Sequence, residues 1–235
     1  MKFEISGITN MGTVRTSNED RILVNGRLLS EGEVHFVDQD SCRTFVADGV
    51  GGNRAGEVAA NYVLEKMNLI PDLCEANFEP YLLRINKDFI SMTKATVSLA
   101  GAATTLTGLM IDANGFLVIH CGDSQLWLFR NEMFFKVTKD QVFDEYQENS
   151  PITSFFGGTN DNLKFDKQVF IDGTVVGDVF LICSDGLFKS LNKESVKSII
   201  KGEADSQTKA RVLIQNCLVN GAEDNVSLVV IRRID

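Results

Sequence analysis

Several aspartates in this sequence stand at the ends of apolar runs, a setting in which carboxylates can gather around a cation. Asp48 and Asp185 each come at the end of such a run, and Asp123 stands two residues beyond another. Asp224 precedes the last apolar run of the chain. Because gathered carboxylates repel one another, a hard divalent cation such as Mg²⁺ or Mn²⁺ would relieve the repulsion.

The spacing of these aspartates predicts that three of them meet in space. In an antiparallel sheet, the end of one strand lies beside the start of the next, so Asp48, Asp185 and Asp224 could converge. Each motif also has a plainer interpretation, since Asp-Gly is a common turn dipeptide and Asp224-Asn225 could be a turn before a strand. Glu19-Asp20 would usually be a solvated pair. Taken singly, none of these motifs identifies a function.

Other chemistries lack their sequence signatures. The chain has no G-x-x-x-x-G-K-[ST] phosphate loop, no G-x-S-x-G elbow, and no cysteine with an arginine six positions later. The glycines at 49–52 could cradle a nucleotide phosphate, but the spaced glycine fingerprint is missing. With only two histidines, a zinc site built from Cys and His has too few ligands.

Hydrophobic periodicity predicts strands, then two helices, strands again, two short helices and a final strand. The first fifty residues read as short strands. One helix is expected over 55–70 and ends at Pro71, and a second begins at Pro80. Further strands are expected at 104–111, 116–121, 126–129, 133–137, 165–171, 179–183 and 226–231, and short helices at 193–201 and 206–218. Asn114-Gly115 predicts a hairpin turn, and 138–162 reads as irregular. This segregated order favours α+β layers with antiparallel sheets.

Composition limits the ligands that the chain could bind and the compartment in which it is expected. Its formal net charge of −9 argues against binding to nucleic acid, which requires a basic face. No run approaches the roughly 20 apolar residues that span a membrane, and no signal segment is visible at the start. The five cysteines are widely spaced, mostly in apolar runs, so reduced core thiols are expected. A cytoplasmic protein is the expectation.

Six motifs in one order resemble the type 2C metal-dependent protein phosphatases (the PPM family), in their compact bacterial form. The resemblance runs from about residue 7 to residue 230. Its motifs are Arg15-Thr16-Ser17-Asn18-Glu19-Asp20, Ala47-Asp48-Gly49-Val50-Gly51-Gly52, Gly101-Ala102-Ala103-Thr104-Thr105, Cys121-Gly122-Asp123-Ser124, Cys183-Ser184-Asp185-Gly186-Leu187 and Glu223-Asp224-Asn225-Val226.

The resemblance implies a four-layer αββα sandwich, with two mainly antiparallel sheets flanked by helix pairs. Residues 1–235 would form a single catalytic domain with a short flap-like irregular segment around 140–162. The implied activity is hydrolysis of phosphoserine and phosphothreonine by direct attack of a water or hydroxide that bridges two Mn²⁺ or Mg²⁺ ions. The implied partners are phosphorylated proteins, opposed by a serine/threonine kinase.

The resemblance also assigns residues to roles. Asp48 would bridge the two cations, the Gly49 carbonyl would bind one of them, and Asp185 and Asp224 would complete the other site. Glu19 and Asp20 would act directly or through bound water. Arg15 would hold the substrate phosphate, for which a planar guanidinium is well shaped. Asp123 would hold a third, weaker cation shared with Asp185.

Three departures from the family pattern bear on this assignment. Val50 stands where many eukaryotic members carry a histidine proposed as general acid, so the proton donor is unassigned. Gln125 and Gln141 replace a frequent arginine and histidine, and the flap is short. One alternative is a weak or inactive member that acts as a phosphoprotein-binding regulatory module. Another is a metal-dependent hydrolase of small phosphate esters or nucleic acid, with the acidic charge weighing against nucleic acid.

Overall fold

The computed structural model describes residues 1–50, 55–70, 78–113, 115–147, 150–159, 163–170 and 173–235. Two six-stranded sheets form its centre. The first has the order β10 (Met133–Lys136), β9 (Gln125–Arg130), β13 (Val179–Cys183), β14 (Val226–Arg233), β1 (Phe3–Asn10) and β4 (Gly32–Gln39). The second has the order β12 (Asp166–Phe170), β8 (Gly115–Cys121), β7 (Leu106–Asp112), β5 (Cys42–Ala47), β2 (Arg21–Val24) and β3 (Arg27–Leu29).

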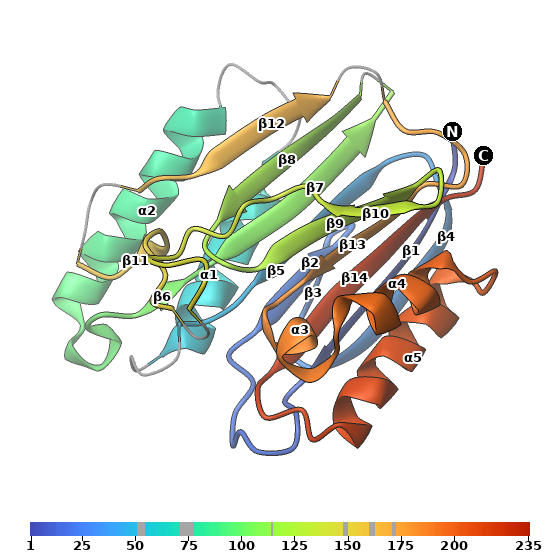
Figure 1. Ribbon diagram of the computed structural model, residues 1–235. Helices are drawn as coiled ribbons and strands as arrows, with labels where there is room; N and C mark the ends of the chain where they lie inside the picture. The colour runs from blue at the N-terminus through green and yellow to red at the C-terminus, as the bar shows by residue number, and fades with distance from the viewer. Residues whose placement is uncertain (51–54, 71–77, 114, 148–149, 160–162, 171–172) are drawn as a thin grey trace.

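The two sheets pack face to face, with helices on their outer faces (Figure 1). Helices α1 (Gly56–Asn68) and α2 (Phe78–Ala95) cover the second sheet. Helices α3 (Gly186–Ser190), α4 (Lys193–Lys201) and α5 (Ser206–Val219) cover the first. A small third sheet joins β6 (Ala103–Thr104) to β11 (Phe156–Gly157). This arrangement confirms the predicted α+β fold of two antiparallel sheets flanked by helices.

Side-chain alternation along buried strands explains the layers. In β13, Leu181 and Cys183 pack against the helices of the first sheet, while Phe180 and Ile182 face the other sheet. Successive strand residues point to opposite faces, so an unbroken apolar run fits a strand that is buried on both sides. The strand of the second sheet that precedes Asp48 follows the same rule, with Phe45 toward the helices and Val46 toward the other sheet.

Most predicted elements are confirmed, with three corrections. Helix α2 begins at Phe78, two residues before Pro80, because proline is tolerated throughout the first helical turn. The strand expected over 104–111 is two pieces, β6 and β7, separated at Thr105. The sequence prediction missed α3, which spans only Gly186–Ser190.

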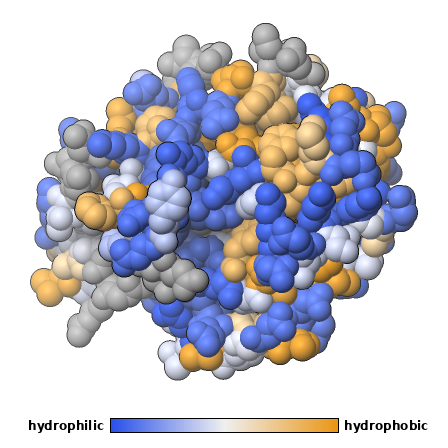
Figure 2. Space-filling model, in the orientation of Figure 1, coloured by the Kyte–Doolittle hydropathy of each residue, from blue (hydrophilic) through white to orange (hydrophobic). Residues whose placement is uncertain are grey.

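Other predictions concern the irregular segment, the thiols and the surface. The described residues of the segment at 138–162 are mostly irregular, but they include β11 and a bridge between Val142 and Ile152. Four cysteines are free and buried: Cys42, Cys121, Cys183 and Cys217. Cys74, Gly51, Gly52, Pro71 and Asn114 lie outside the described residues. The face seen in Figure 2 is mostly hydrophilic, and in the described chain no helix is long and apolar enough to cross a membrane.

Candidate metal centre

The acidic residues singled out in the sequence lie at one end of the two sheets. Asp48 follows β5, Asp185 follows β13 and Asp224 precedes β14. Strands β13 and β14 pair antiparallel with Cys183 opposite Leu228, which brings Asp185 and Asp224 to the same end. A hollow of about 440 Å³ is lined by all three, together with Arg15, Glu19, Gly49 and Asp123.

Two glycines allow the backbone to pack closely around this hollow. A Cβ at Gly49 would lie 2.5 Å from the carbonyl carbon of Gly56 and 2.8 Å from the carbonyl oxygen of Glu19. A Cβ at Gly186 would lie 2.0 Å from the carbonyl oxygen of Asn225. All three distances are far below van der Waals contact, so any larger residue would push the acidic segments apart. Each Asp-Gly dipeptide is therefore a point of close backbone approach.

Burial and mutual repulsion disfavour the charged forms of several of these carboxyls. Burial, followed by the charges of Asp20 and Asp185, raises the pKa of Asp48 well above its ordinary value. Burial raises the pKa of Asp123 to about 7 and that of Asp20 to about 6, and hydrogen bonds from serines oppose the shift at Asp20. Burial also raises the pKa of Asp185. The site therefore favours a bound positive charge.

Asp20 has one carboxylate oxygen anchored and one left without a partner. Ser184 Oγ donates a hydrogen bond to Asp20 Oδ2 at 2.7 Å, and Ser184 Oγ accepts from the Ser227 N–H at 3.0 Å. The Asp20 side chain is almost completely buried, yet its Oδ1 has no hydrogen-bond partner. A buried carboxylate oxygen without a donor is costly, and a cation would satisfy it.

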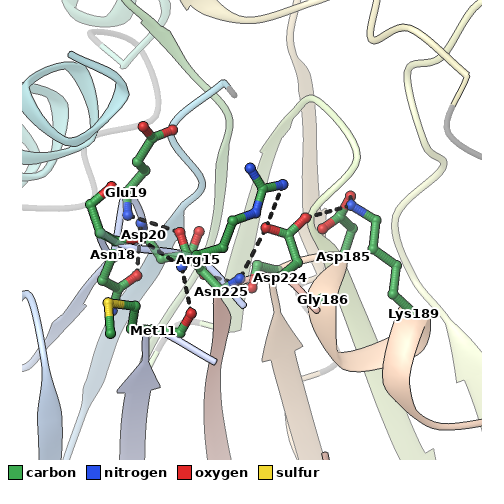
Figure 3. A network of polar contacts seen from close by, with 12 residues as sticks. Met11, Arg15, Asn18, Glu19, Asp20, Asp185, Gly186, Lys189, Asp224 and Asn225 are labelled. Atoms are coloured by element: carbon green, nitrogen blue, oxygen red, sulfur yellow. Dashed lines mark hydrogen bonds and ion pairs between the residues drawn. The ribbon is translucent and has the colours of Figure 1, made fainter. Parts of the chain in front are cut away.

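Two cationic side chains contact Asp224 from opposite sides (Figure 3). Arg15 Nη2 lies 2.9 Å from Asp224 Oδ1, and Lys189 Nζ lies 2.8 Å from Asp224 Oδ2. Lys189 Nζ also lies 2.6 Å from Asp185 Oδ2. Burial alone would raise the pKa of Asp224, but the hydrogen bond and charge of Lys189 hold it below its ordinary value.

Asn225 ties the loop at 11–19 to the start of β14. Its Oδ1 accepts a hydrogen bond from the Glu19 N–H at 2.9 Å. Its Nδ2 donates to the carbonyl oxygens of Met11 at 2.8 Å and Ser17 at 3.0 Å. Three hydrogen bonds from one buried amide thus fix the loop that carries Arg15 and Glu19 (Figure 3).

These residues suit hard divalent cations. Carboxylate and carbonyl oxygens are the ligands that Mg²⁺ and Mn²⁺ prefer, and the partnerless Asp20 Oδ1 and the raised carboxyl pKa values both favour an added positive charge. Within the described part of the chain, no three acidic, histidine or cysteine side chains are already arranged tightly enough to hold one ion. Side chains would therefore move when a cation binds. Lys189 is one that would move, because its ammonium contacts Asp185 and Asp224.

The structure brings every sequence-predicted site residue to this end of the molecule. Arg15, Glu19, Asp48, Gly49, Asp123, Asp185 and Asp224 line the hollow, and Asp20 lies behind it. Sequence analysis gave no role to Lys189, and it did not anticipate that Ser184 and Asn225 act as anchors. A helical pairing of Asp185 with the residue four positions later could have indicated Lys189.

Comparisons with known proteins give the family. Residues 28–213 match the model of the family described as protein phosphatase 2C. The chain is 24% identical to the serine/threonine phosphatase stp of Listeria innocua, over 96% of this chain and 94% of stp. It is 27% identical to the protein phosphatase PhpP of Streptococcus pneumoniae, over 97% and 96%.

Solved structures agree with that match. The catalytic domain of the serine/threonine protein phosphatase PstP, in complex with two manganese ions, superposes with a TM-score of 0.79 at 25% identity, over 100% of this chain and 99% of that one. The fold and the acidic hollow define an αββα enzyme scaffold with a divalent-cation centre. The chain belongs to the protein phosphatase 2C family, as the sequence motifs predicted.

Proposed function

We propose that this chain is a metal-dependent serine/threonine phosphatase that removes phosphate from phosphoserine and phosphothreonine in protein substrates. One observation carries the proposal: five acidic side chains and Arg15 converge on one hollow at the ends of the central strands. The family match and the names of the relatives support the same activity. The manganese ions in the PstP structure support Mn²⁺ or Mg²⁺ as the cofactor.

The proposed roles follow from the position of each group. Two bound cations would supply an activated water and neutralise charge on the transferring phosphoryl group. Asp48 lines the same hollow as Glu19, Asp185 and Asp224, and the family resemblance assigns its carboxylate as a ligand common to both ions. The Gly49 carbonyl would add a neutral oxygen on the Glu19 side. Asp123 would bind a third ion together with Asp185.

Arg15 is the proposed phosphate-binding residue. Its guanidinium is half-exposed at the rim of the hollow and rests on Asp224 Oδ1 through one nitrogen. Its remaining N–H groups can donate to a phosphate in the planar fork that suits phosphate oxygens. Arg15 would thereby orient the phosphoryl group toward the carboxylates and stabilise negative charge on it.

A second hollow, of about 890 Å³, extends from Arg15 and Lys189. We call this larger hollow the substrate groove, because a substrate polypeptide would lie in it beside the metal centre. Beyond the metal centre its charged lining is acidic: Asp140, Asp144, Glu145 and Glu223. We expect a phosphopeptide with arginines beside the phosphoresidue to show about a tenfold higher kcat/KM than the same peptide with glutamates, because its charge is complementary. Added salt should reduce the difference in kcat/KM between the two peptides, because it screens their charges.

Substitutions in the groove check this expectation. Glu223→Gln should reduce the preference for the arginine peptide, whereas Glu203→Gln, which removes an exposed charge away from the groove, should leave it unchanged. Equal kcat/KM for the two peptides at low salt would contradict a role for the groove in selection.

Phosphate release from a phosphothreonine peptide tests the proposed activity itself. We expect release in Mn²⁺, its loss in excess EDTA and its recovery when Mn²⁺ is restored. A folded chain that binds phosphopeptide in Mn²⁺ without releasing phosphate would instead support the binding-module alternative. Faster release from nucleotides than from any phosphopeptide would support a small-ester hydrolase.

The proposed partners are phosphoproteins, with a serine/threonine kinase as the opposing activity. We further propose that residues 1–235 act as one catalytic domain in the cytoplasm, in which the irregular segment around 140–162 forms one wall of the substrate groove. The contribution of Asp140, Val142, Asp144 and Glu145 to that groove supports a substrate-facing role for this segment.

A further inference from the structure

Lys189 makes an unusual pair of contacts in the centre of the candidate site. It lies one helical turn after Asp185, and its N–H donates to the Asp185 carbonyl oxygen at 3.0 Å. Its side chain turns back so that Nζ lies 2.6 Å from Asp185 Oδ2 and 2.8 Å from Asp224 Oδ2 (Figure 3). One ammonium therefore joins two carboxylates that lie beside the ends of different strands, β13 and β14. The family resemblance assigns the same two carboxylates to one cation.

The ammonium occupies one oxygen of each carboxylate that a divalent cation would use. Mg²⁺ binds carboxylate oxygens at about 2.0–2.1 Å and holds several of them around one centre. A divalent ion bound to both Oδ2 atoms would lie within about 4 Å of an ammonium that still contacts them, where the two positive charges repel strongly. The two contacts of Lys189 therefore oppose full coordination of a cation by Asp185 and Asp224.

Lys189 has space to move away from these carboxylates. Its side chain is 40% exposed, whereas those of Asp185 and Asp224 are 24% and 20% exposed. The residue lines both the metal-centre hollow and the larger groove. A rotation of its flexible side chain would carry the ammonium toward solvent without moving the backbone of α3.

We propose that Lys189 competes with one divalent cation for the carboxylates of Asp185 and Asp224, and so weakens cation binding at that half of the centre. The inference rests on the proposed metal centre and adds to it an unequal pair of sites. Among the described residues, no Lys or Arg side chain forms an ion pair with Glu19 or Asp48, in contrast to Asp185 and Asp224. The Glu19–Asp48 half should therefore fill at lower Mn²⁺ concentration than the Asp185–Asp224 half.

Mn²⁺ titration of the whole chain without substrate tests the proposal, with free Mn²⁺ followed by electron paramagnetic resonance. The titration uses the Asp123→Asn chain, so that the proposed third ion does not contribute, and this chain should show a tighter and a weaker class of site. Lys189→Gln should tighten the weaker class about tenfold, while Lys189→Arg, which keeps the charge, should not tighten it. Lys136→Gln is the matched control, because Lys136 Nζ pairs with Asp140 at 2.9 Å rather than with the assigned ligands.

Thermal unfolding provides a second readout that does not need activity. Lys189→Gln should melt lower than wild type in EDTA, because two neighbouring carboxylates lose their shared cation, and should gain more than wild type from saturating Mn²⁺. Lys189→Met, which is also neutral, should behave in the same way if the glutamine variant folds poorly.

The outcomes separate this inference from the proposed function. Unchanged or weaker Mn²⁺ affinity in Lys189→Gln would overturn the competition, and weaker affinity would show instead that Lys189 aligns the carboxylates. A wild-type chain that binds no Mn²⁺ would overturn the metal centre as well. Two-site Mn²⁺ binding with tightening in Lys189→Gln supports the inference even if no tested phosphopeptide is hydrolysed.

Discussion

Asp48→Asn is expected to lower Mn²⁺-dependent phosphate release by at least about a hundredfold, since loss of groups that merely support metal ligands already costs about 10–100-fold. The backbone of Asp48 is held independently of its carboxylate. Its N–H donates to Thr105 Oγ1 at 3.0 Å, and its carbonyl oxygen accepts from Thr104 Oγ1 and from the Thr105 N–H, both at 2.9 Å. The substitution should therefore remove the charge without moving the strand end.

The same substitution should stabilise the chain in EDTA. Burial and neighbouring carboxylates raise the pKa of Asp48, which means that its charged form is disfavoured by folding. A neutral amide of similar size avoids that cost at neutral pH. A variant with far lower activity but a higher melting temperature in EDTA would identify Asp48 as a cation ligand. Substitution of a residue that served only to hold the fold would lower both the activity and the melting temperature.

The pH dependence of stability in EDTA has a definite sign. Asp20 and Asp123 have pKa values of about 6 and about 7, against an ordinary value of 3.8. Between these values the folded chain retains protons that the unfolded chain has lost, so stability falls as the pH rises from about 4 to about 7. Saturating Mn²⁺ should reverse the trend, because cations bind the deprotonated carboxylates.

Urea unfolding at pH 5 and pH 7.5, with and without Mn²⁺, would measure the fall in stability with rising pH and its reversal by Mn²⁺. The matched control is Asp88→Asn, which removes an exposed carboxylate that pairs with Arg84 on α2. This control should change neither activity nor the pH trend. Wild-type stability in EDTA that increases up to pH 7.5, or an Asp48→Asn chain that is less stable there, would contradict the repulsion on which the metal centre rests.

Sequence patterns predicted the layers because most elements carry a local signal in the spacing of their apolar residues. Val179–Cys183 is an unbroken apolar run of strand length, and Lys193–Lys201 and Ser206–Val219 show helical spacing with capping residues Asn192 and Asp205. In contrast, Gly186–Ser190 is too short for a helical period to appear. The break at Thr105 depends on its hydrogen bonds with Asp48, which no local pattern encodes.

The candidate site, too, was only partly predictable from the sequence. The family motifs located the acidic residues, but a motif does not show which neutral or basic residue supports them. Ser184 acts through a hydrogen bond to Asp20, 164 positions away in the sequence. Lys189 depends on α3, the helix that was missed, because only a helical turn places its side chain beside Asp185. Such contacts follow from the fold rather than from spacing alone.

Asn225→Ala should lower kcat/KM for a phosphopeptide by about tenfold to a hundredfold without removing any proposed metal ligand. Asn225 is 6% exposed, and its side chain makes three hydrogen bonds with the 11–19 loop. Without that amide, the Glu19 N–H and the carbonyl oxygens of Met11 and Ser17 lose their partners, at a cost of about 1–3 kcal/mol for each group that stays buried. The loop should then hold Arg15 and Glu19 less well in place.

Amide hydrogen exchange distinguishes this loss of position from a general loss of stability. In Asn225→Ala, exchange should accelerate in residues 11–19, while the core strands β13 and β14 keep most of their protection. Asn225→Asp should not restore activity, because a carboxylate would face the carbonyl oxygens of Met11 and Ser17. Asn216→Ala, at an exposed position on α5, is the control and should behave like wild type. Full activity in Asn225→Ala, or faster exchange spread evenly over both sheets, would show that the amide does not position the loop for phosphate binding.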